Sequence, residues 1–332
     1  MIEFSQAERQ LLSTLRMILK KEETANHEAL ERYGKRLFDD ELVDWAEAFE
    51  SLSEKGLLQQ RDDVYSLTSE GEAQAKEAQR EQFSQGFADT LTRSELSKAY
   101  GTFCERVFGK NLCQFNMMDM EQLNKLLDVL HLDENCLVLD LGCGTGTITE
   151  YISDVTQAHL TGIDYAMGAI EQALRRTGSK RDRLSFREGD MNDLDYPSDS
   201  FDTIIAIDTL YFVDDLEVTL SHMKKILRPS GQMGLFYSQM IKPDESREVL
   251  LPEKTRLAQA LKKHGLRFRV WDYTELEERL WQKGKHVAEE LRSEFEAEGN
   301  LDLYRGRIQE SEKLLKLVDP VRHSRFLYQV QL

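Results

Sequence analysis

The sequence predicts an α/β fold, in which a mostly parallel sheet carries helices on both faces. Three observations support this prediction: short apolar runs alternate with helical stretches, acidic residues end several of the runs, and a glycine-rich turn joins the first run to a helix. The predicted strands are residues 136–141, 160–164, 184–190, 201–208 and 232–237. Because ligands of such sheets bind beyond the carboxyl ends of the strands, we expect one crevice to contain the residues there: Asp140, Asp164, Asp190, Asp208 and Tyr237.

The glycine-rich turn consists of Gly142, Gly144 and Gly146, and a helix is predicted to begin at Thr147. Glycines at alternate positions let a ligand approach bare backbone, and the free N–H groups of a helix start point at the turn. The spacing is G-x-G-x-G, whereas dinucleotide-binding turns use G-x-G-x-x-G. Asp140 would repel a pyrophosphate and suits a cationic ligand such as a sulfonium. The structural alternative is a tight turn without a ligand.

The run from Val138 to Gly146, VLDLGCGTG, resembles the first motif of class I S-adenosylmethionine-dependent methyltransferases that act on small molecules. The resemblance covers residues 133–238 and, more weakly, a terminal strand at 326–330. It implies a Rossmann-like seven-stranded sheet whose final strand is antiparallel. It also implies that S-adenosylmethionine is the cofactor.

The resemblance assigns cofactor-binding residues by position. The methionine end would lie against Asp140 and the turn, Asp164 would hold the ribose with Tyr165 beside it, and Asp190 and Met191 would hold the adenine. The full predicted set is Asp140, Gly142, Cys143, Gly144, Gly146, Asp164, Tyr165, Asp190, Met191, Asp208 and Thr209.

Asp208 and Tyr211 are the predicted catalytic residues, because they follow the fourth strand where an acceptor would lie. The predicted substrate-binding residues are Tyr100, Phe115, Tyr211 and Tyr237. Core packing is the alternative for Tyr100 and Phe115, and a helix cap is the alternative for Asp208. Methyl transfer depends mainly on in-line positioning, so no universal catalytic residue is expected. The four cysteines lack metal-site spacing, and we predict reduced thiols and no metal.

Three domains are predicted. Residues 1–85 form a winged-helix-like domain for dimerisation or active-site closure, with helices at 6–21 and within 30–56 that break near 38–40. A hairpin follows at 57–60 and 64–68, then a helix with a Ser69–Glu72 capping box and a linker at 83–86. Residues 86–131 form a helical connector with helices at 94–108 and 118–130. Residues 132–332 form the methyltransferase domain, with helices at 216–227 and 252–264, a short strand at 268–271 and a helical lid insertion at 274–323 that breaks at 299–300.

The chain of 332 residues has 43 basic and 60 acidic residues, a net charge of −17. Such acidity disfavours nucleic acid and anionic membranes as partners. The helix that would read DNA, residues 40–55, is itself acidic, with Glu41, Asp44, Glu47, Glu50 and Glu54. No apolar run approaches the roughly 20 residues of a membrane span, and no signal peptide is evident. We therefore expect a cytoplasmic protein with a small-molecule substrate and a possible homodimer.

The predicted function is in-line methyl transfer from S-adenosylmethionine to a nitrogen or oxygen atom of a small molecule. Two alternatives stay open. One is an NAD-linked oxidoreductase on a related sheet. The other is a non-catalytic regulator that binds the cofactor and signals through the winged helix.

Overall fold

The computed structural model describes residues 3–20, 24–37, 45–242, 244–318 and 322–332. The chain forms two compact units, residues 1–87 and residues 88–332. Helix α4 (Ser69–Leu96) begins in the first unit and ends in the second.

The N-terminal unit contains helices, a two-stranded hairpin and the start of α4. Its elements are α1 (Gln6–Lys20), α2 (His27–Leu37), α3 (Ala46–Glu54), β1 (Leu58–Arg61) and β2 (Val64–Leu67). The hairpin is antiparallel, with Leu58 opposite Leu67. Leu11, Leu15 and Ile18 of α1 pack on Leu52 and Leu58 in one core. The predicted helices and hairpin are confirmed, the break at 38–40 falls outside the described residues, and the winged-helix assignment stays a prediction.

Two local predictions in this region are wrong. The linker at 83–86 is instead part of α4, which is one continuous helix. The segment contains no proline, and a single glycine costs a helix only about 1 kcal/mol. The cap of α4 is also displaced by one residue, because the hydroxyl of Thr68, not that of Ser69, accepts the hydrogen bond from the N–H of Gly71.

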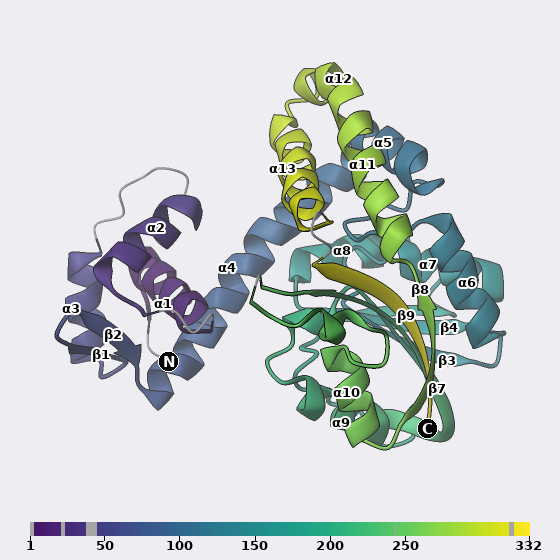
Figure 1. Cartoon of the computed structure of the whole chain (residues 1–332), viewed down its shortest axis with the longest axis horizontal. Coiled ribbons are helices and arrows are strands. Elements are labelled where there is room, and N and C mark those ends of the chain that lie inside the picture. The colour runs from purple at the N-terminus through teal and green to yellow at the C-terminus, as the bar shows by residue number, and fades with distance from the viewer. Residues whose placement is uncertain (1–2, 21–23, 38–44, 243, 319–321) are drawn as a thin grey trace. The chain divides into compact units, whose positions relative to one another are not determined.

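The C-terminal unit is built on a seven-stranded sheet of order β5-β4-β3-β6-β7-β9-β8 (Figure 1). Its strands are β3 (Leu137–Leu141), β4 (His159–Asp164), β5 (Leu184–Glu188), β6 (Phe201–Ile207), β7 (Leu227–Met240), β8 (Arg267–Asp272) and β9 (His323–Gln331). The pairs from β5 to β7 are parallel, and β9 is antiparallel to both β7 and β8. The seven-stranded, mostly parallel sheet with an antiparallel final strand is therefore confirmed.

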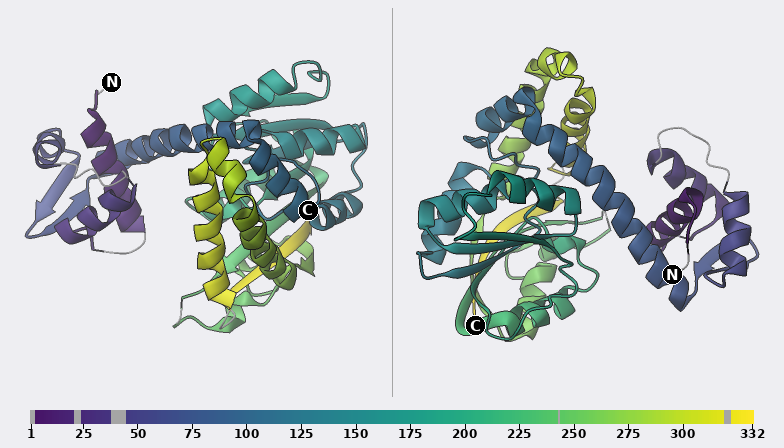
Figure 2. Two further views of the ribbon diagram at one scale, coloured as in Figure 1. Left: turned by 90° about the horizontal axis from the view of Figure 1, so that it is seen from above. Right: turned by 180° about the vertical axis from the view of Figure 1, so that it is seen from behind.

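Helices cover both faces of this sheet, as Figures 1 and 2 show. One face packs on α6 (Met120–Leu130), α7 (Thr147–Thr156) and α8 (Met167–Arg176), and the other on α9 (Leu216–Ile226) and α10 (Arg256–Lys263). The short 3-10 helices are η1 (Leu210–Phe212) and η2 (Arg247–Leu250). The prediction that Pro252 lies in the first turn of a helix is wrong, because α10 begins only after its N-cap Thr255.

The predicted helical insertion contains three helices: α11 (Thr274–Glu290), α12 (Arg292–Ala297) and α13 (Leu301–Val318). They pack with α5 (Lys98–Phe108), and Phe103, Trp281 and Phe295 share one core (Figure 1). Glu298 accepts hydrogen bonds from the hydroxyl of Ser97 at 2.5 Å and the N–H of Ala99 at 3.0 Å, and so caps α5. A lid role for the insertion stays a prediction.

Across the described part of the chain, no helix combines the length and the apolarity needed to cross a bilayer.

Candidate functional site

The glycine-rich turn connects the end of β3 to the start of α7. The N–H groups of Gly142 and Cys143 both donate to the carbonyl of Ile163 in the neighbouring strand β4, at 2.8 and 3.0 Å. Gly142, Gly144 and Gly146 all have positive φ, at 75°, 54° and 71°. The turn is therefore held against the end of β4 in a backbone conformation that glycine adopts without strain.

The three glycines have different surroundings. A Cβ on Gly142 would clash with the side chain of Thr209, and a Cβ on Gly146 would clash with the ring of Phe186. A Cβ on Gly144 would meet only a methyl group of Leu91, at 3.9 Å. Packing thus requires glycine at the outer two positions, whereas the middle one borders open space that a ligand could use.

Asp140 lies beneath the turn and not on its surface. It is 3% exposed, and the hydroxyl of Thr149 donates to its carboxylate at 2.6 Å. Burial raises the pKa of Asp140 to about 6, the Thr149 hydrogen bond lowers it, and the charge of Asp164 raises it further. At neutral pH the carboxylate is mostly ionised and places a negative charge below the turn.

Asp164 joins the turn to the end of β4. One carboxylate oxygen accepts from the N–H of Gly144 and the other from the N–H of Ala166, both at 2.9 Å. Each oxygen keeps a second lone pair that could accept from a ribose hydroxyl. Burial raises the pKa of Asp164, and these backbone hydrogen bonds lower it. Tyr165, the next residue, is half-buried.

Asp190 lies just past β5, at the same edge of the sheet. The N–H of Gly189 donates to the carbonyl of Asp164 at 3.0 Å, which joins the ends of the two strands. Asp190 accepts from the backbone and side-chain nitrogens of Asn192, at 2.8 and 2.7 Å. Met191 is buried and packs in the core with Ile163. The predicted cofactor residues from three strands therefore lie at one edge of the sheet.

Asp208 follows β6 and forms a buried ion pair with Arg325. Arg325 of β9 donates to both of its carboxylate oxygens, at 2.5 and 2.8 Å, and the N–H of Met117 donates at 3.3 Å. The next residue, Thr209, donates to the carbonyl of Leu141 at 2.9 Å. This pairing places a guanidinium on both carboxylate oxygens of Asp208, while its neighbour Thr209 contacts the turn. The catalytic role of Asp208 stays a prediction.

The loop at residues 109–119 contacts both the start of α7 and the residue that follows β6. The carbonyl of Leu112 accepts from the hydroxyl of Thr147 at the start of α7, and Met117 reaches Asp208. Phe115 of the same loop is half-buried and stacks on Tyr100, with ring centroids 5.3 Å apart. The loop therefore connects the glycine turn to the end of β6.

The four predicted substrate-binding residues differ in exposure. Tyr100 is 1% exposed and donates to the carbonyl of Gln114 at 2.8 Å, so it packs in the core. Tyr211 is 45% exposed, and its ring centroid lies 6.3 Å from that of the buried Tyr237. Burial around its hydroxyl raises the pKa of Tyr211, and the charges of Asp208 and Glu277 raise it further. Tyr211 therefore lies at the surface beside a buried charged group.

Sequence reasoning missed several polar residues of this region: Gln122, Thr149, Ser238, Glu277, His323 and Arg325. For two of them, the sequence pattern itself indicates a buried charged residue. Glu277 interrupts the apolar stripe of its helix, next to Leu276 and three residues before Leu280, and Arg325 directly precedes the apolar terminal strand. A charged residue within an apolar pattern indicates a buried partner.

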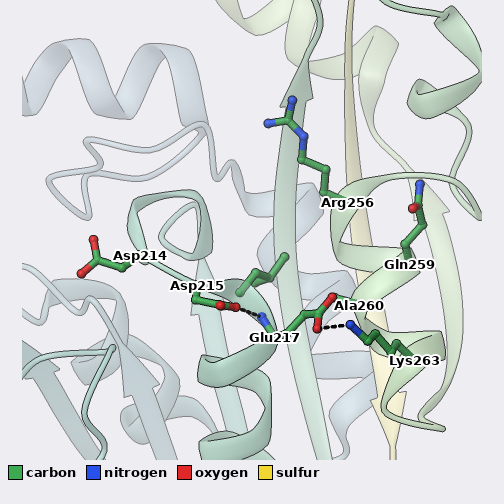
Figure 3. A pocket seen from close by; sticks show the side chains of 8 residues that line it. Asp214, Asp215, Glu217, Arg256, Gln259, Ala260 and Lys263 are labelled. Carbon is green, nitrogen blue, oxygen red and sulfur yellow. Dashed lines mark hydrogen bonds and ion pairs between the residues drawn. The ribbon is translucent and has the colours of Figure 1, made fainter. Parts of the chain in front are cut away.

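An open surface cavity of about 640 Å³ lies between the start of α9 and α10 (Figure 3). Its walls carry both signs of charge, and Lys263 pairs there with Glu217. The lining residues are Asp214, Asp215, Leu216, Glu217, Arg256, Gln259, Ala260 and Lys263, and none of them belongs to the predicted cofactor set.

Among the described residues, no group of three or more histidine, cysteine, aspartate or glutamate side chains is arranged to hold a metal ion. The cysteines are free. Burial raises the pKa of Cys143 in the turn, with the charges of Asp164 and Asp140 raising it further, so this thiol stays protonated.

These residues fit an S-adenosylmethionine site. Open space beside Gly144 admits a ligand to the backbone, and two buried carboxylates provide a negative field for a sulfonium and an α-amino group. Spare acceptor positions on Asp164 suit hydroxyl groups. When bound, the cofactor supplies an electrophilic methyl group. The turn, Asp140 and Asp164 would hold it.

Comparisons with known proteins agree with this geometry. Residues 138–231 match the family model described as "Methyltransferase domain". Over 137 residues the chain is 29% identical to phosphoethanolamine N-methyltransferase of Triticum aestivum, covering 41% of this chain and 27% of that protein. Over 109 residues it is 33% identical to sterol 24-C-methyltransferase of Debaryomyces hansenii, covering 32% and 29%. The chain thus spans less than a third of the length of either relative.

A solved structure has a similar fold. It is Haemonchus contortus phosphoethanolamine N-methyltransferase 2 in complex with phosphomonomethylethanolamine and S-adenosylhomocysteine. The TM-score is 0.61 at 18% identity, with 74% of this chain and 60% of that chain covered. The fold, the edge residues and the family match lead to one conclusion: the chain carries a class I methyltransferase domain, and the methyl donor of this family is S-adenosylmethionine.

Proposed function

We propose that the protein transfers a methyl group from S-adenosylmethionine to a nitrogen or oxygen atom of a small molecule. The observation that carries this proposal is the hydrogen bond from Gly144 to Asp164, which joins the open glycine position to the predicted ribose acid. Together with Asp140 beneath them, these residues make one negatively charged cradle at the sheet edge.

Two features support a small-molecule acceptor. Tyr211 and Phe212 are 45% and 60% exposed just past the fourth parallel strand, and their rings pack edge to face. They offer an aromatic surface where an acceptor would lie. The net charge of −17 disfavours the approach of a nucleic acid.

Cofactor binding is the first test. We expect calorimetric titration of the full chain with S-adenosylhomocysteine to give a micromolar Kd. The Asp164→Asn variant should bind at least tenfold more weakly, and the exposed Asp195→Asn variant should bind like the wild type. Binding of NAD in place of S-adenosylhomocysteine would contradict the proposal.

Acceptor choice is the second test. Purified protein is incubated with S-adenosylmethionine labelled in its methyl group and a panel of small amines and alcohols. Transfer of label to a member of the panel is expected. Transfer only to carbon, in a molecule without an amine or hydroxyl, would contradict the nitrogen or oxygen assignment.

A further inference from the structure

Arg325 of β9 belongs to a closed ring of hydrogen bonds that passes through the backbone of Met117. The guanidinium donates to the side-chain oxygen of Gln122 at 2.8 Å and to the two carboxylate oxygens of Asp208 at 2.5 and 2.8 Å. The N–H of Met117 donates to Asp208 at 3.3 Å, and the carbonyl of Met117 accepts from the side-chain amide of Gln122 at 2.7 Å. Both backbone groups of Met117 are therefore held by side chains that Arg325 itself holds.

The ring is shielded from water. The exposed fractions of its members lie between 0% and 7%, for Met117, Gln122, Asp208 and Arg325. Water cannot replace a hydrogen bond lost at such a depth, so a member without its partner is costly. The ring therefore holds the backbone at Met117 in one conformation.

The other end of the same loop is attached to the start of α7. The hydroxyl of Thr147, which directly follows Gly146 of the glycine turn, donates to the carbonyl of Leu112. Between the two attachments, the buried side chain of Gln114 accepts from the N–H of Leu112 at 2.9 Å and donates to the carbonyl of Lys110 at 3.0 Å. The loop is therefore fixed at both ends and cross-linked within.

The segment 112–117 joins two sides of the predicted cofactor site. On one side Thr147 follows the glycine turn, in which Gly144 borders open space. On the other side Asp208 precedes Thr209, whose hydroxyl donates to the end of β3 at 2.9 Å. Both attachments lie at the carboxyl ends of parallel strands, where ligands of such sheets bind. The segment thus runs beside the position predicted for the methionine end of the cofactor.

We propose that Arg325 and Gln122 are positioning residues, which act through Met117 to hold the segment 112–117 as a fixed wall of the methyl-transfer site. The inference rests on the proposed function and deepens it, because it names residues that keep the methyl donor in line with the acceptor. In-line transfer requires the reacting atoms to be held within a fraction of an ångström. A loosened wall lets the bound donor drift, so it lowers kcat more than it weakens cofactor binding.

Two buried glutamines provide a matched pair of variants that separates positioning from stability. Gln122→Met cuts the ring at residue 122, while the ion pair between Arg325 and Asp208 stays. Gln329 is the control, because it is 8% exposed, lies on β9 and donates to the carbonyl of Val129 in α6 at 2.6 Å. Gln329→Met thus removes a buried hydrogen bond to the main chain outside the ring. Both changes should lower the midpoint of urea denaturation.

The first test follows the segment directly, by hydrogen–deuterium exchange of the full chain and mass spectrometry. In the free protein, Gln122→Met should speed exchange of the amides at 112–118 by about tenfold or more, because local opening becomes easier. Gln329→Met should leave exchange there at the wild-type rate. Bound S-adenosylhomocysteine should slow exchange of the same amides in the wild type. Unchanged exchange at 112–118 when S-adenosylhomocysteine binds would overturn the proposal, because a wall of the site must be shielded by its ligand.

The second test measures kcat and KM with an acceptor that the wild type labels in the panel, at a temperature where all variants are folded. Gln122→Met should lower kcat about 100-fold, while the KM for S-adenosylmethionine rises only severalfold. Gln329→Met should leave both close to the wild-type values. Gln122→Glu keeps an oxygen for Arg325 but, when ionised at pH 8, has no donor for the carbonyl of Met117. It should show the same fall in kcat, and it replaces Gln122→Met if that variant fails to fold.

The two proposals fail in different ways. Equal falls in kcat for Gln122→Met and Gln329→Met, or a wild-type kcat in both, would overturn this inference and leave the proposed function intact. A wild-type protein that neither binds S-adenosylhomocysteine nor methylates any member of the panel would overturn both.

Discussion

Arg325 donates two hydrogen bonds to Asp208, and Asp208 has a φ of +58°, in the left-handed region. A non-glycine residue in that region is strained by about 1–2 kcal/mol. The ion pair therefore contributes to holding the chain in its turn after β6, from which Thr209 reaches the glycine turn. A bond between two strands far apart in the sequence thus shapes the candidate site.

Breaking this pair should be costly. Arg325→Met leaves Asp208 buried without a cation, and we expect a loss of about 3–5 kcal/mol in the free energy of unfolding. Urea denaturation measures it. The double variant with Asp208→Asn should recover part of the loss, because the Asp208 side chain then carries no unpaired charge. Arg228→Met removes a more exposed pair with Asp202 and should cost about 1 kcal/mol or less. Equal losses at the two sites would contradict this account.

Alanine at the three turn glycines should separate stability from binding. Gly142→Ala and Gly146→Ala introduce clashes with Thr209 and Phe186, so both should lower the melting temperature markedly. Gly144→Ala meets open space, and its strain at positive φ costs about 1–2 kcal/mol. Its main effect should be a rise of at least tenfold in the Kd for S-adenosylhomocysteine. Tight binding by Gly144→Ala would show that the ligand does not approach this position.

Asp140 should make stability depend on pH in a defined window. Its pKa is raised from 3.8 to about 6, so the folded state binds the proton more tightly than the unfolded chain. The resulting stability is fully present below about pH 4 and is lost as the pH rises through 6. Asp140→Asn does not show this loss. Its free energy of unfolding, relative to that of the wild type, should therefore rise by about 1–3 kcal/mol between pH 4 and 7.

Thermal denaturation at several pH values measures this gain. Asp195→Asn, an exposed change, should follow the wild-type profile throughout. If Asp140→Asn and the wild type keep a constant difference across the window, Asp140 does not titrate there.

The sequence predicts the strands of the sheet and the acids that follow them, because each strand and its terminal acid leave a local pattern. The alternation of apolar runs with helices indicated the parallel strands, and the G-x-G-x-G turn marked the switch from β3 to α7. The partners of the acids were not predictable in this way. Arg325 is 117 residues from Asp208, and no local pattern relates the two.

Other errors have a similarly physical origin. The segment at 83–86 was predicted to be a linker because it is small and polar, yet the helix continues through it. Glu277 was not among the predicted site residues, although it is the one acid of α11 that lies buried, because the apolar residues around it indicate a helix face and do not identify a partner for the acid.

Arg176 should couple the glycine turn to two helices. It donates to Glu150 of α7 and to the carbonyl of Thr145 in the turn, each at 2.6 Å, and to Glu95 of α4 at 2.7 Å. These bonds to carboxylates raise the pKa of Arg176 despite its burial. Because one guanidinium hydrogen-bonds the turn and two carboxylates, Arg176→Gln removes all three contacts. It should lower the free energy of unfolding by about 1–3 kcal/mol.

The same variant should raise the Kd for S-adenosylhomocysteine severalfold, since the carbonyl of Thr145 is no longer held. Arg175→Gln is the matched control. Arg175 is the preceding residue, is exposed and pairs only with Glu171 among the described residues, so its loss should affect neither quantity. Calorimetry and urea denaturation on the two variants give both readouts. If Arg176→Gln loses stability but binds S-adenosylhomocysteine as the wild type does, the hydrogen bonds of Arg176 stabilise the fold without shaping the turn.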